Sequence, residues 1–311
     1  MGTMEKEKIR EAVRERYGNI ARVGAEASEL RQVTSCCGDS GVSVKPESEG
    51  SCGCTTEFSP ENISAAMGYS GKDIESVPDG ANLGLGCGNP VALASIKPGE
   101  TVVDLGSGGG FDCFLAADRV GDAGRVIGVD MTPDMVAKAR KNAEKTKAKN
   151  VEFRLGEIEH LPVADNSADI IISNCVINLS PDKPGVYKDA FRALKPGGRL
   201  AVSDILATAE IPDDVRANLA MVSACIGGAA TIEDTEKMLK ETGFMDIRIR
   251  SKEEIREMIQ KWAPGGNIED YVISASIEAV KPFMTLNSLA SEPAFIKESR
   301  GIVYALRIRV K

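Results

Sequence analysis

The sequence predicts an α/β fold in which a doubly wound, mostly parallel sheet is covered by helices on both faces. Short apolar runs alternate with helical segments from residue 101 onward, and the first of these runs leads into a glycine-rich turn. The chain has 311 residues, of which 42% are hydrophobic, as in an ordinary globular protein. Strands that are apolar along their whole length are typical of parallel sheets buried on both faces.

The expected elements follow in order along the chain. A charged helix is expected within residues 5–32, then a loop rich in Ser, Gly and Cys at 34–56, and short helical pieces at 57–100. Apolar runs predict strands at Thr101–Leu105, Arg125–Val129, Val151–Leu155, Asp169–Ser173 and Arg199–Ser203. Helical spacing predicts helices near 111–120, 133–147, 183–194, 211–224 and 233–242. Lys195–Gly198 is expected to be a tight turn before the fifth strand. The later strand-like runs are Met245–Ile249, Tyr271–Val280 and the candidate Val303–Val310.

The charge of the chain limits its partners. A formal net charge of −8 argues against nucleic acid, because phosphate contacts need a basic face. No stretch approaches the roughly 20 apolar residues that cross a bilayer, and the first residues lack the apolar core of a secretory signal. We therefore expect a cytoplasmic protein with no membrane partner, and a monomer as the default.

The eight cysteines are informative in that compartment, where thiols stay mostly reduced. A disulfide framework is not expected, which leaves metal or metalloid binding, redox chemistry and buried structural roles. The chain has a single histidine, His160, so a mechanism that needs a histidine base has almost no material. We expect His160 to lie at the surface or to pack, and the single Trp262 to pack.

The strongest local motif is the glycine-rich turn from Val102 to Asp112. Its glycines follow the spacing G-x-G-x-G, with Asp104 two residues before the first of them, and a second acid, Asp130, ends the next strand. Dinucleotide sites favour G-x-G-x-x-G, and Asp104 would repel a pyrophosphate. The pattern resembles the class I S-adenosylmethionine methyltransferases, which have a Rossmann-like sheet. A nicotinamide or flavin enzyme and a glycine turn without a ligand are the alternatives.

This resemblance implies that S-adenosylmethionine is the cofactor. Asp104 would help to hold the cationic methionine end, and Asp130 is placed to accept both ribose hydroxyls. The segment after the third strand would contact adenine, and Asn174 would lie beside the methyl group. Taken alone, Glu159 would be better explained as a solvated surface acid, but its place after the third strand favours the cofactor contact. The expected cofactor-binding residues are Asp104, Gly106, Ser107, Gly108, Asp130, Met131, Ile158, Glu159 and Asn174.

Three separated cysteines indicate the substrate. Cys175 lies at the carboxyl end of the fourth strand, on the edge where open α/β sheets bind ligands. Cys225 follows a helix expected to fold back over this edge, and Cys87 lies just before the first strand. Thiols are soft ligands, and all three could converge above the cofactor. Cys113 is expected to be a buried structural residue, the commonest role of a free cysteine.

Over residues 9–282 the sequence resembles the arsenite methyltransferases. The pieces that carry the resemblance are Gly86–Gly88, Asp104–Cys113, Ser173–Pro181 and Cys225–Ala229. The resemblance implies that Cys87, Cys175 and Cys225 bind trivalent arsenic as thiolates. Cys36 or Cys37 would match an N-terminal cysteine that delivers arsenic and takes part in disulfide exchange.

The implied reaction is consistent with the single histidine of the chain. Trivalent arsenic bound by three thiolates keeps a lone pair that can attack a sulfonium methyl group, so no general base is required. The products would be mono- and dimethylated arsenicals, and thioredoxin or glutathione would reduce the cysteines afterwards. The chain departs from eukaryotic members at Leu85, where they have tyrosine, and at Ala224, where they have glutamate. Cys52 and Cys54 also exceed the family pattern.

The chain is therefore expected to have three parts. Residues 1–95 would form a helical, cysteine-containing cap, and residues 96–282 the methyltransferase domain, with a helical insertion at about 205–243 over the active site. Residues 283–311 would be a C-terminal extension of unknown role. Two rival functions remain: methylation of a small organic substrate, and metalloid binding by thiols without catalysis.

Overall fold

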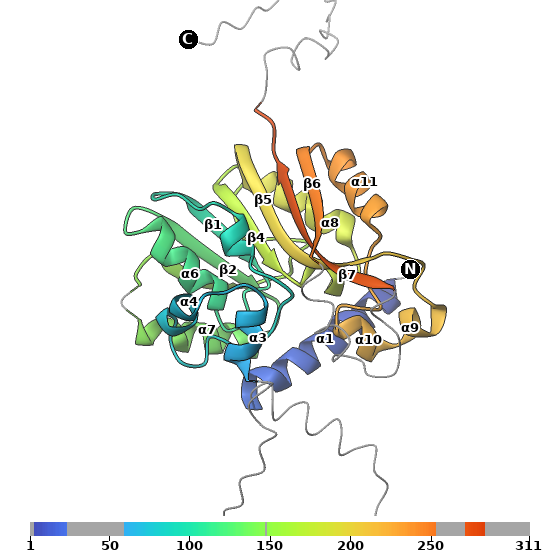
Figure 1. Ribbon diagram of the computed structural model, residues 1–311, viewed down its shortest axis with the longest axis horizontal. Helices are drawn as coiled ribbons and strands as arrows, with labels where there is room; N and C mark the ends of the chain where they lie inside the picture. The colour runs from blue at the N-terminus through green and yellow to red at the C-terminus, as the bar shows by residue number, and fades with distance from the viewer. Residues whose placement is uncertain (1–2, 24–58, 147, 253–270, 284–311) are drawn as a thin grey trace, which may run out of the picture.

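The computed structural model describes residues 3–23, 59–146, 148–252 and 271–283 (Figure 1). Several expectations lie outside these residues. They concern the loop at 34–56 with its four cysteines, Trp262, the candidate strand Val303–Val310 and the extension after residue 283.

The described strands form one seven-stranded sheet in the order β3-β2-β1-β4-β5-β7-β6. Neighbouring strands from β1 to β5 are parallel, whereas β7 runs antiparallel between β5 and β6. The predicted doubly wound α/β class is confirmed. The strands are β1 (Thr101–Leu105), β2 (Arg125–Asp130), β3 (Val151–Leu155), β4 (Ala168–Asn174), β5 (Leu194–Ala207), β6 (Met245–Lys252) and β7 (Val272–Val280).

Alternate side chains of the central strands enter two separate apolar layers. In β1, Val102 packs into one buried cluster and Val103 into another, and β4 repeats this pattern at Ile170 and Ile171. Successive side chains of a strand point to opposite faces, so both faces of the sheet are buried. The continuous apolar runs of the sequence follow from this burial.

Helices cover both faces (Figure 1). Buried residues of α5 (Pro90–Leu93), α6 (Phe111–Val120) and α7 (Pro133–Lys145) join the cluster of Val102. Residues of α8 (Lys183–Ala193) and α11 (Ile232–Thr242) join the cluster of Val103. Two short helices, α3 (Pro60–Ala66) and α4 (Gly71–Ser76), precede α5, as the broken helical pattern of this region predicts.

The N-terminal helix and part of the insertion lie over the carboxyl ends of the strands. The helix α1 (Thr3–Val23) contacts α7, the short helix η1 (Ile177–Leu179) and α10 (Leu219–Ser223). The single helix expected near 211–224 is two helices, α9 (Asp213–Ala217) and α10. Asn218 separates them, because its side chain accepts hydrogen bonds from the N–H groups of Ala220 and Met221 and so begins a new helix.

One turn prediction is wrong. Lys195–Gly198 lies within β5, which begins at Leu194 instead of Arg199. The pairing of β5 with β4 shifts register between Ala168 and Ile170, and Gly197 has a φ of +80°. The Pro-Gly-Gly signal therefore marks an irregularity inside a strand, where glycine supplies a left-handed conformation.

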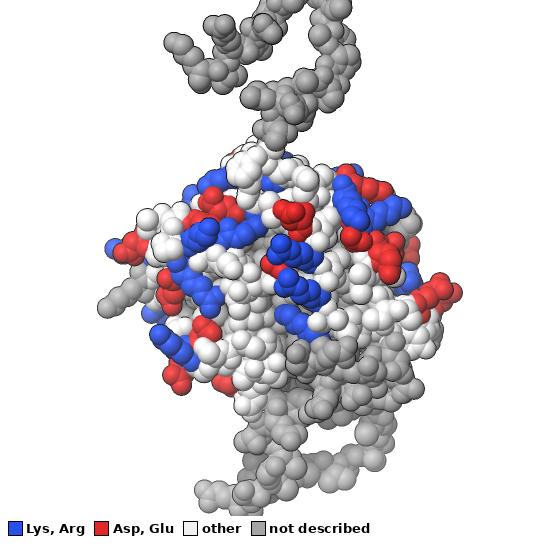
Figure 2. All heavy atoms as spheres, turned by 45° about the horizontal axis from the view of Figure 1, so that its top comes forward, with Lys and Arg blue, Asp and Glu red and all other residues white. Residues whose placement is uncertain are grey.

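The described surface has mixed charge. On the face shown in Figure 2, basic and acidic side chains lie close to one another over the described part of the molecule. The helices of the described ranges all fall short of the length and apolar character that a membrane-spanning helix needs.

Candidate active site

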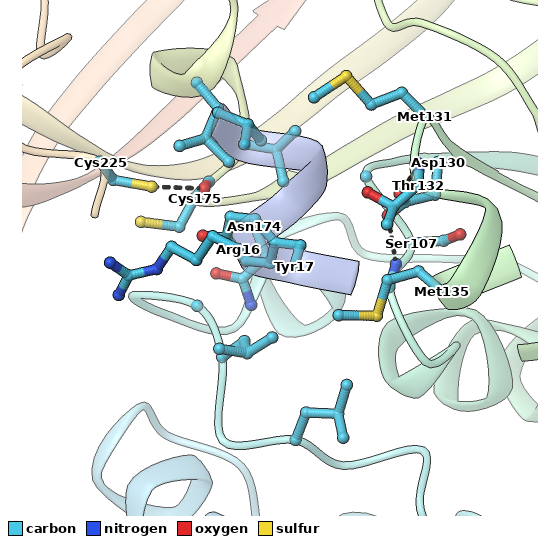
Figure 3. Close-up of a pocket in the computed structure, with 18 of the residues that line it drawn as sticks. Arg16, Tyr17, Ser107, Asp130, Met131, Thr132, Met135, Asn174, Cys175 and Cys225 are labelled. Carbon is cyan, nitrogen blue, oxygen red and sulfur yellow. Dashed lines mark hydrogen bonds between the residues drawn. The ribbon is translucent and has the colours of Figure 1, made fainter. Parts of the chain in front are cut away.

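A pocket of about 550 Å³ lies at the carboxyl ends of β1, β2 and β4. Its wall comes from α1, the glycine loop after β1, the ends of β2 and β4, and the segment around α10 (Figure 3). The strand order reverses at this place, because β2 and β4 lie on opposite sides of β1. Open α/β sheets bind ligands at such a point. All of the residues expected to bind the cofactor line it: Asp104, Gly106, Ser107, Gly108, Asp130, Met131, Ile158, Glu159 and Asn174.

The glycine loop turns tightly over the end of β2. The N–H groups of Gly106 and Ser107 donate to the carbonyl of Val129 at 2.7 and 3.0 Å. Gly106 has a φ of +70°, and a Cβ atom there would lie 2.4 Å from a methyl carbon of Val176. Glycine is required at this position by both the conformation and the space.

Asp130, the last residue of β2, holds the glycine loop in place through its side chain (Figure 3). Its Oδ2 accepts a hydrogen bond from the N–H of Gly108 at 2.9 Å, and its Oδ1 accepts one from the N–H of Thr132 at 2.8 Å. Burial raises the pKa of this carboxyl group, while the backbone donors oppose the rise. Each carboxylate oxygen can accept more than one hydrogen bond, so Asp130 can still receive ribose hydroxyls.

Two observations fit a polar, cationic ligand in the loop. The Oγ of Ser107 is buried at the pocket and has no hydrogen-bond partner among the described residues, and a bound ligand can supply one. Burial and the neighbouring carboxylates of Asp112 and Asp130 raise the pKa of Asp104 well above its ordinary value. A cation beside these carboxylates would be favoured and a pyrophosphate repelled.

The structure brings the three predicted arsenic ligands together. Cys87, Cys175 and Cys225 are at most 7% exposed and belong to one buried cluster. The Sγ of Cys225 donates to the carbonyl of Cys175 at 2.9 Å. Hydrogen bonding to Cys225 and Cys87, together with burial, raises the pKa of the Cys175 thiol well above its usual range. Cys175 and Cys225 belong to the pocket wall, with Cys87 beside Cys175.

Unusual backbone conformations place two of these thiols. Cys175 has a φ of +58° and Cys225 a φ of +66°. Residues other than glycine rarely adopt this left-handed region, at a cost of about 1–3 kcal/mol each. The N–H of Cys175 donates to the carbonyl of Ser203 at 2.7 Å, which ties this residue to β5. The two strained residues meet at one point of the pocket, which is typical of a functional site.

Asn174 connects the thiols to the cofactor loop. Its Oδ1 accepts from the N–H of Cys87 at 2.9 Å, and its Nδ2 donates to the carbonyl of Gly88 at 2.8 Å. The same Nδ2 lies 3.0 Å from the hydroxyl of Tyr69 and 3.2 Å from Asp112. The hydroxyl of Tyr69 donates to Asp112 at 2.6 Å. Burial raises the pKa of Asp112 to about 6, although the hydrogen bonds from Tyr69 and Asn174 oppose the rise.

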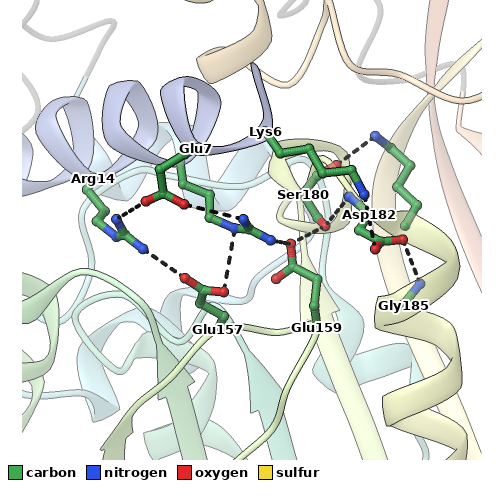
Figure 4. Close-up of polar contacts among 10 residues, drawn as sticks. Lys6, Glu7, Arg14, Glu157, Glu159, Ser180, Asp182 and Gly185 are labelled. Carbon is green, nitrogen blue, oxygen red and sulfur yellow. Dashed lines mark hydrogen bonds and ion pairs between the residues drawn. The ribbon is translucent and has the colours of Figure 1, made fainter. Parts of the chain in front are cut away.

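The helix α1 closes the pocket with ion pairs (Figure 4). Arg10 lies 3.5 Å from Glu157 and 3.4 Å from Glu159, and Arg14 lies 2.8 Å from Glu157. Glu159 is 5% exposed and also accepts from the hydroxyl of Ser180 at 2.7 Å. An adenine contact is predicted for Glu159. In the structure, Glu159 joins α1 to the segment after β3 through its ion pair with Arg10.

Sequence reasoning missed several residues at the site. Tyr17 lies on α1, and its hydroxyl is 3.4 Å from the carbonyl of Ser223. Burial and the neighbouring Cys225 raise the pKa of Tyr17 well above its ordinary value. Asp112 and Asp204 were also missed. The signal for Asp204 was its place at the carboxyl half of β5, the same edge that holds Cys175.

The structural roles predicted for Cys113 and His160 are confirmed. Cys113 is fully buried between α6 and the sheet, and its thiol also donates to Asp104 at 3.2 Å. His160 is exposed.

The acidic loop suits a cationic ligand and not a pyrophosphate, as the resemblance of its glycine motif to the S-adenosylmethionine methyltransferases implies. The protein is a methyltransferase that depends on this cofactor. A family model described as a methyltransferase domain matches residues 96–243.

The relatives narrow this class. An arsenite methyltransferase of Halobacterium salinarum is 51% identical over 276 residues, which are 89% of this chain and 67% of that protein. The chain belongs to the arsenite methyltransferase family. Another arsenite methyltransferase, from Aquipseudomonas alcaligenes, is 44% identical over 171 residues, and this match spans 53% of the present chain and 49% of that relative.

Solved structures agree with this placement. An arsenic(III) S-adenosylmethionine methyltransferase from Chlamydomonas reinhardtii is 32% identical, with a TM-score of 0.52 over 71% of this chain and 73% of that one. Phosphoethanolamine N-methyltransferase 2 of Haemonchus contortus is 21% identical, with a TM-score of 0.53 over 73% of this chain and 59% of the other. That likeness concerns the fold alone.

Proposed function

We propose that this protein transfers the methyl group of S-adenosylmethionine to trivalent arsenic bound by Cys87, Cys175 and Cys225. The substrates would be arsenite, presented as a thiol complex, and methylarsenite. The observation that carries the proposal is the convergence of three buried thiols from distant parts of the chain: Cys175 and Cys225 line the pocket of the glycine loop, and Cys87 lies directly behind them in the same buried cluster. The biological role would be arsenic detoxification.

The residues of the loop would hold the cofactor. Bound S-adenosylmethionine supplies an electrophilic methyl group on a cationic sulfur. Asp104 would accept the cationic methionine end, Asp130 the ribose hydroxyls, and Ser107 a further hydrogen bond through its free Oγ. Met131 and Ile158 would offer apolar contacts, and Asn174 and Glu159 would hold their neighbours in place. Such positioning against a bound nucleophile would supply most of the rate enhancement.

The thiols would bind the substrate without a dedicated base. Burial and mutual hydrogen bonds raise the pKa of Cys175, and burial raises that of Cys87, so both are protonated in the free protein. When a cysteine sulfur replaces a hydroxide on arsenic, its proton leaves with that hydroxide as water. When the arsenic arrives on an external thiol, the proton leaves with that thiol. The bound arsenic then keeps its lone pair for the methyl group.

A reducing step would complete the cycle. Methyl transfer uses the arsenic lone pair and leaves oxidised arsenic, which needs two electrons to return to the trivalent state. Cys36 and Cys37, outside the described residues, would take part in arsenic delivery and in disulfide exchange. Thioredoxin or glutathione would then reduce the cysteine pair. We propose that the protein works as a monomer in the cytoplasm.

We also propose a functional division of the chain. Residues 1–95 would form the cap and 96–282 the methyltransferase domain, with 283–311 as an extension of unknown role. Within the insertion at 205–243, α10 lines the pocket, whereas α11 packs on α8 and β6. The covering role would therefore belong to the first half of the insertion.

Arsenic speciation after incubation with arsenite, S-adenosylmethionine and a thiol tests the proposal. We expect methylated arsenicals from the unchanged protein and none from Cys175→Ser or Cys225→Ser, while both variants still bind the cofactor. Cys113→Ser is a control for general damage to a buried thiol. Methylation retained by Cys175→Ser or Cys225→Ser would contradict the proposed ligand set.

The same experiment separates the rival functions. Stoichiometric arsenite binding without any methylated product would indicate a metalloid-binding protein. No binding of arsenite, together with methylation of a quinone or another small organic acceptor, would indicate the organic methyltransferase.

A further inference from the structure

Asp204 adds a carboxylate to the thiol cluster. Within the described residues, the Sγ atoms of Cys87 and Cys175 and a carboxylate oxygen of Asp204 all lie within 4.8 Å of one another, and the three residues are buried. The pairing of β4 with β5 brings them together. Asn174, the last residue of β4, is in register with Ser203, so Cys175 and Asp204, which follow them, lie side by side although β5 continues to Ala207.

One oxygen of this carboxylate makes no hydrogen bond to the described residues, although the N–H groups of Ile177 and Asn178 lie near enough to favour its charged form. The Oδ1 of Asp204 accepts from the Nδ2 of Asn178 at 3.0 Å and from the N–H of Ile205 at 2.8 Å. The Oδ2 has no hydrogen-bond partner among the described residues, although Asp204 is only 2% exposed. A buried carboxylate oxygen without a partner is costly, and a bound cation would remove that cost.

Arsenic alone does not explain this donor set. Trivalent arsenic is thiophilic, and the three cysteines already supply three sulfur ligands. A carboxylate beside two thiolates is a mixed soft and hard set, which suits a borderline divalent cation. Zinc takes cysteine sulfur and carboxylate oxygen in tetrahedral sites.

We propose that Cys87, Cys175 and Asp204 form a binding site for a thiophilic divalent cation such as Zn²⁺, with Cys225 or water in the fourth position. Binding would displace one proton from each of the two thiols to solvent. With water in the fourth position, two thiolates and one carboxylate carry three negative charges, so the filled site would have a net charge of −1. With Cys225 in that position a third proton would leave and the net charge would be −2. The half-buried ammonium of Lys183, which donates to the carbonyl of Ser180 at 3.1 Å, lies close enough to interact with Asp204 and would offset this charge.

Cation binding has a consequence for the proposed reaction. The cation would occupy two of the three thiols assigned to arsenic, so the two ligands would exclude each other. This consequence rests on the proposed function, but cation binding itself does not. It can be measured without arsenite and without S-adenosylmethionine, so a failure of one proposal is distinguishable from a failure of the other.

The test uses the reduced, metal-free full chain in which Cys36, Cys37, Cys52 and Cys54 are replaced by serine. Co²⁺ is the probe, because it takes tetrahedral zinc sites and its absorption reports thiolate ligands. We expect one Co²⁺ per chain with thiolate charge-transfer bands, and loss of these bands when Zn²⁺ or arsenite is added. Absence of thiolate bands would overturn the inference.

Asp204→Asn isolates the carboxylate. Loss of a group that only supports a metal ligand already lowers affinity by about 10- to 100-fold, so we expect Asp204→Asn to weaken Zn²⁺ binding at least about tenfold in competition with a chelator. Asp169→Asn is the matched control. Asp169 lies at the start of β4 and its carboxylate pairs with Lys195, so this variant should bind Zn²⁺ normally. Equal Zn²⁺ affinity in Asp204→Asn and the background would overturn the site.

A second measurement does not depend on the folding of any Asp204 variant. The ¹¹³Cd chemical shift of the cadmium-loaded background protein separates sulfur-only ligation from mixed sulfur and oxygen ligation. A shift typical of mixed ligation supports the site, and a shift typical of sulfur-only ligation overturns the role of Asp204.

Discussion

The side-chain carbonyl of Asn174 accepts a hydrogen bond from the N–H of Cys87 at 2.9 Å. This contact joins the loop before β1 to the end of β4, two segments 87 positions apart. It holds Cys87 next to Cys175, the residue that follows Asn174. The spacing of Cys87 and Cys175 therefore depends on the side-chain amide of Asn174.

Replacing Asn174 by alanine should separate thiol geometry from cofactor binding. We expect a large loss of arsenic methylation with a smaller effect on S-adenosylmethionine affinity, and a loss of about 1–3 kcal/mol in unfolding free energy from the unpaired N–H of Cys87. Asn150→Ala is the control, since Asn150 also donates to two carbonyls, those of Ala117 and Gly121, away from the pocket. The two variants are compared under conditions in which urea titration shows that both are folded. Equal arsenic methylation by both would argue against a positioning role for Asn174.

A methyl group at Gly106 should abolish cofactor binding. The added Cβ of Gly106→Ala would lie 2.4 Å from a methyl carbon of Val176, and the loop would have to move. Gly99→Ala is a matched control, because Gly99 also has a positive φ of +84° but has open space around it. We expect Gly99→Ala to cost only about 1–2 kcal/mol of stability and to bind the cofactor normally. Calorimetric titration with S-adenosylhomocysteine compares the two, and undiminished binding by Gly106→Ala would be inconsistent with this loop geometry.

The ion pairs of α1 should contribute to cofactor retention. Arg10→Met removes the contacts to Glu157 and Glu159, and we expect the KM for S-adenosylmethionine to rise by at most about tenfold, since such pairs contribute about 1 kcal/mol. Added salt should reduce the difference from the unchanged protein. Arg22→Met is the control on the same helix, because Arg22 pairs with Asp134 at an exposed position. An unchanged KM in Arg10→Met would contradict the proposal that α1 helps to close the pocket over the cofactor.

Stability should fall as pH rises between about 4 and 6, in part through Asp112. Burial raises the pKa of Asp112 to about 6 in the folded state, from 3.8. The folded protein then binds more protons than the unfolded chain in this window, so ionisation at higher pH favours unfolding, by at most about 3 kcal/mol for this shift. Asp112→Asn should flatten this slope in urea titrations.

Asp189 is the control for the pH effect, because its pKa is shifted in the opposite direction to that of Asp112. Burial acts to raise the pKa of Asp189, but hydrogen bonds from Arg192 and Leu161 lower it overall. Its contribution to stability is present above the unfolded pKa and is lost as pH falls, so Asp189→Asn should lose stability at neutral pH. A steeper fall of stability with rising pH in Asp112→Asn would contradict the assignment.

Local sequence patterns predicted the sheet and much of the pocket, because they depend on residues close together in the chain. The apolar runs located the strands, and the edge rule for parallel strands placed Cys175 beside the glycine loop. The same rule indicates the edge at which Asp204 lies but not its contact with the thiols, and it does not place Tyr17. The position of Asp204 depends on the register between β4 and β5, and that of Tyr17 on how α1 packs across the finished sheet. The Pro-Gly-Gly signal misled because local turn chemistry does not show whether a strand continues through it.

X-ray absorption at the arsenic edge counts the sulfur and oxygen atoms that bind the arsenic. With arsenite bound to the chain that lacks Cys36, Cys37, Cys52 and Cys54, we predict three sulfur neighbours and no oxygen. After Cys225→Ser we predict two sulfurs and one oxygen. Arsenic with fewer than three sulfurs in the first sample, or with three sulfurs still present after Cys225→Ser, would contradict the proposed three-thiol site.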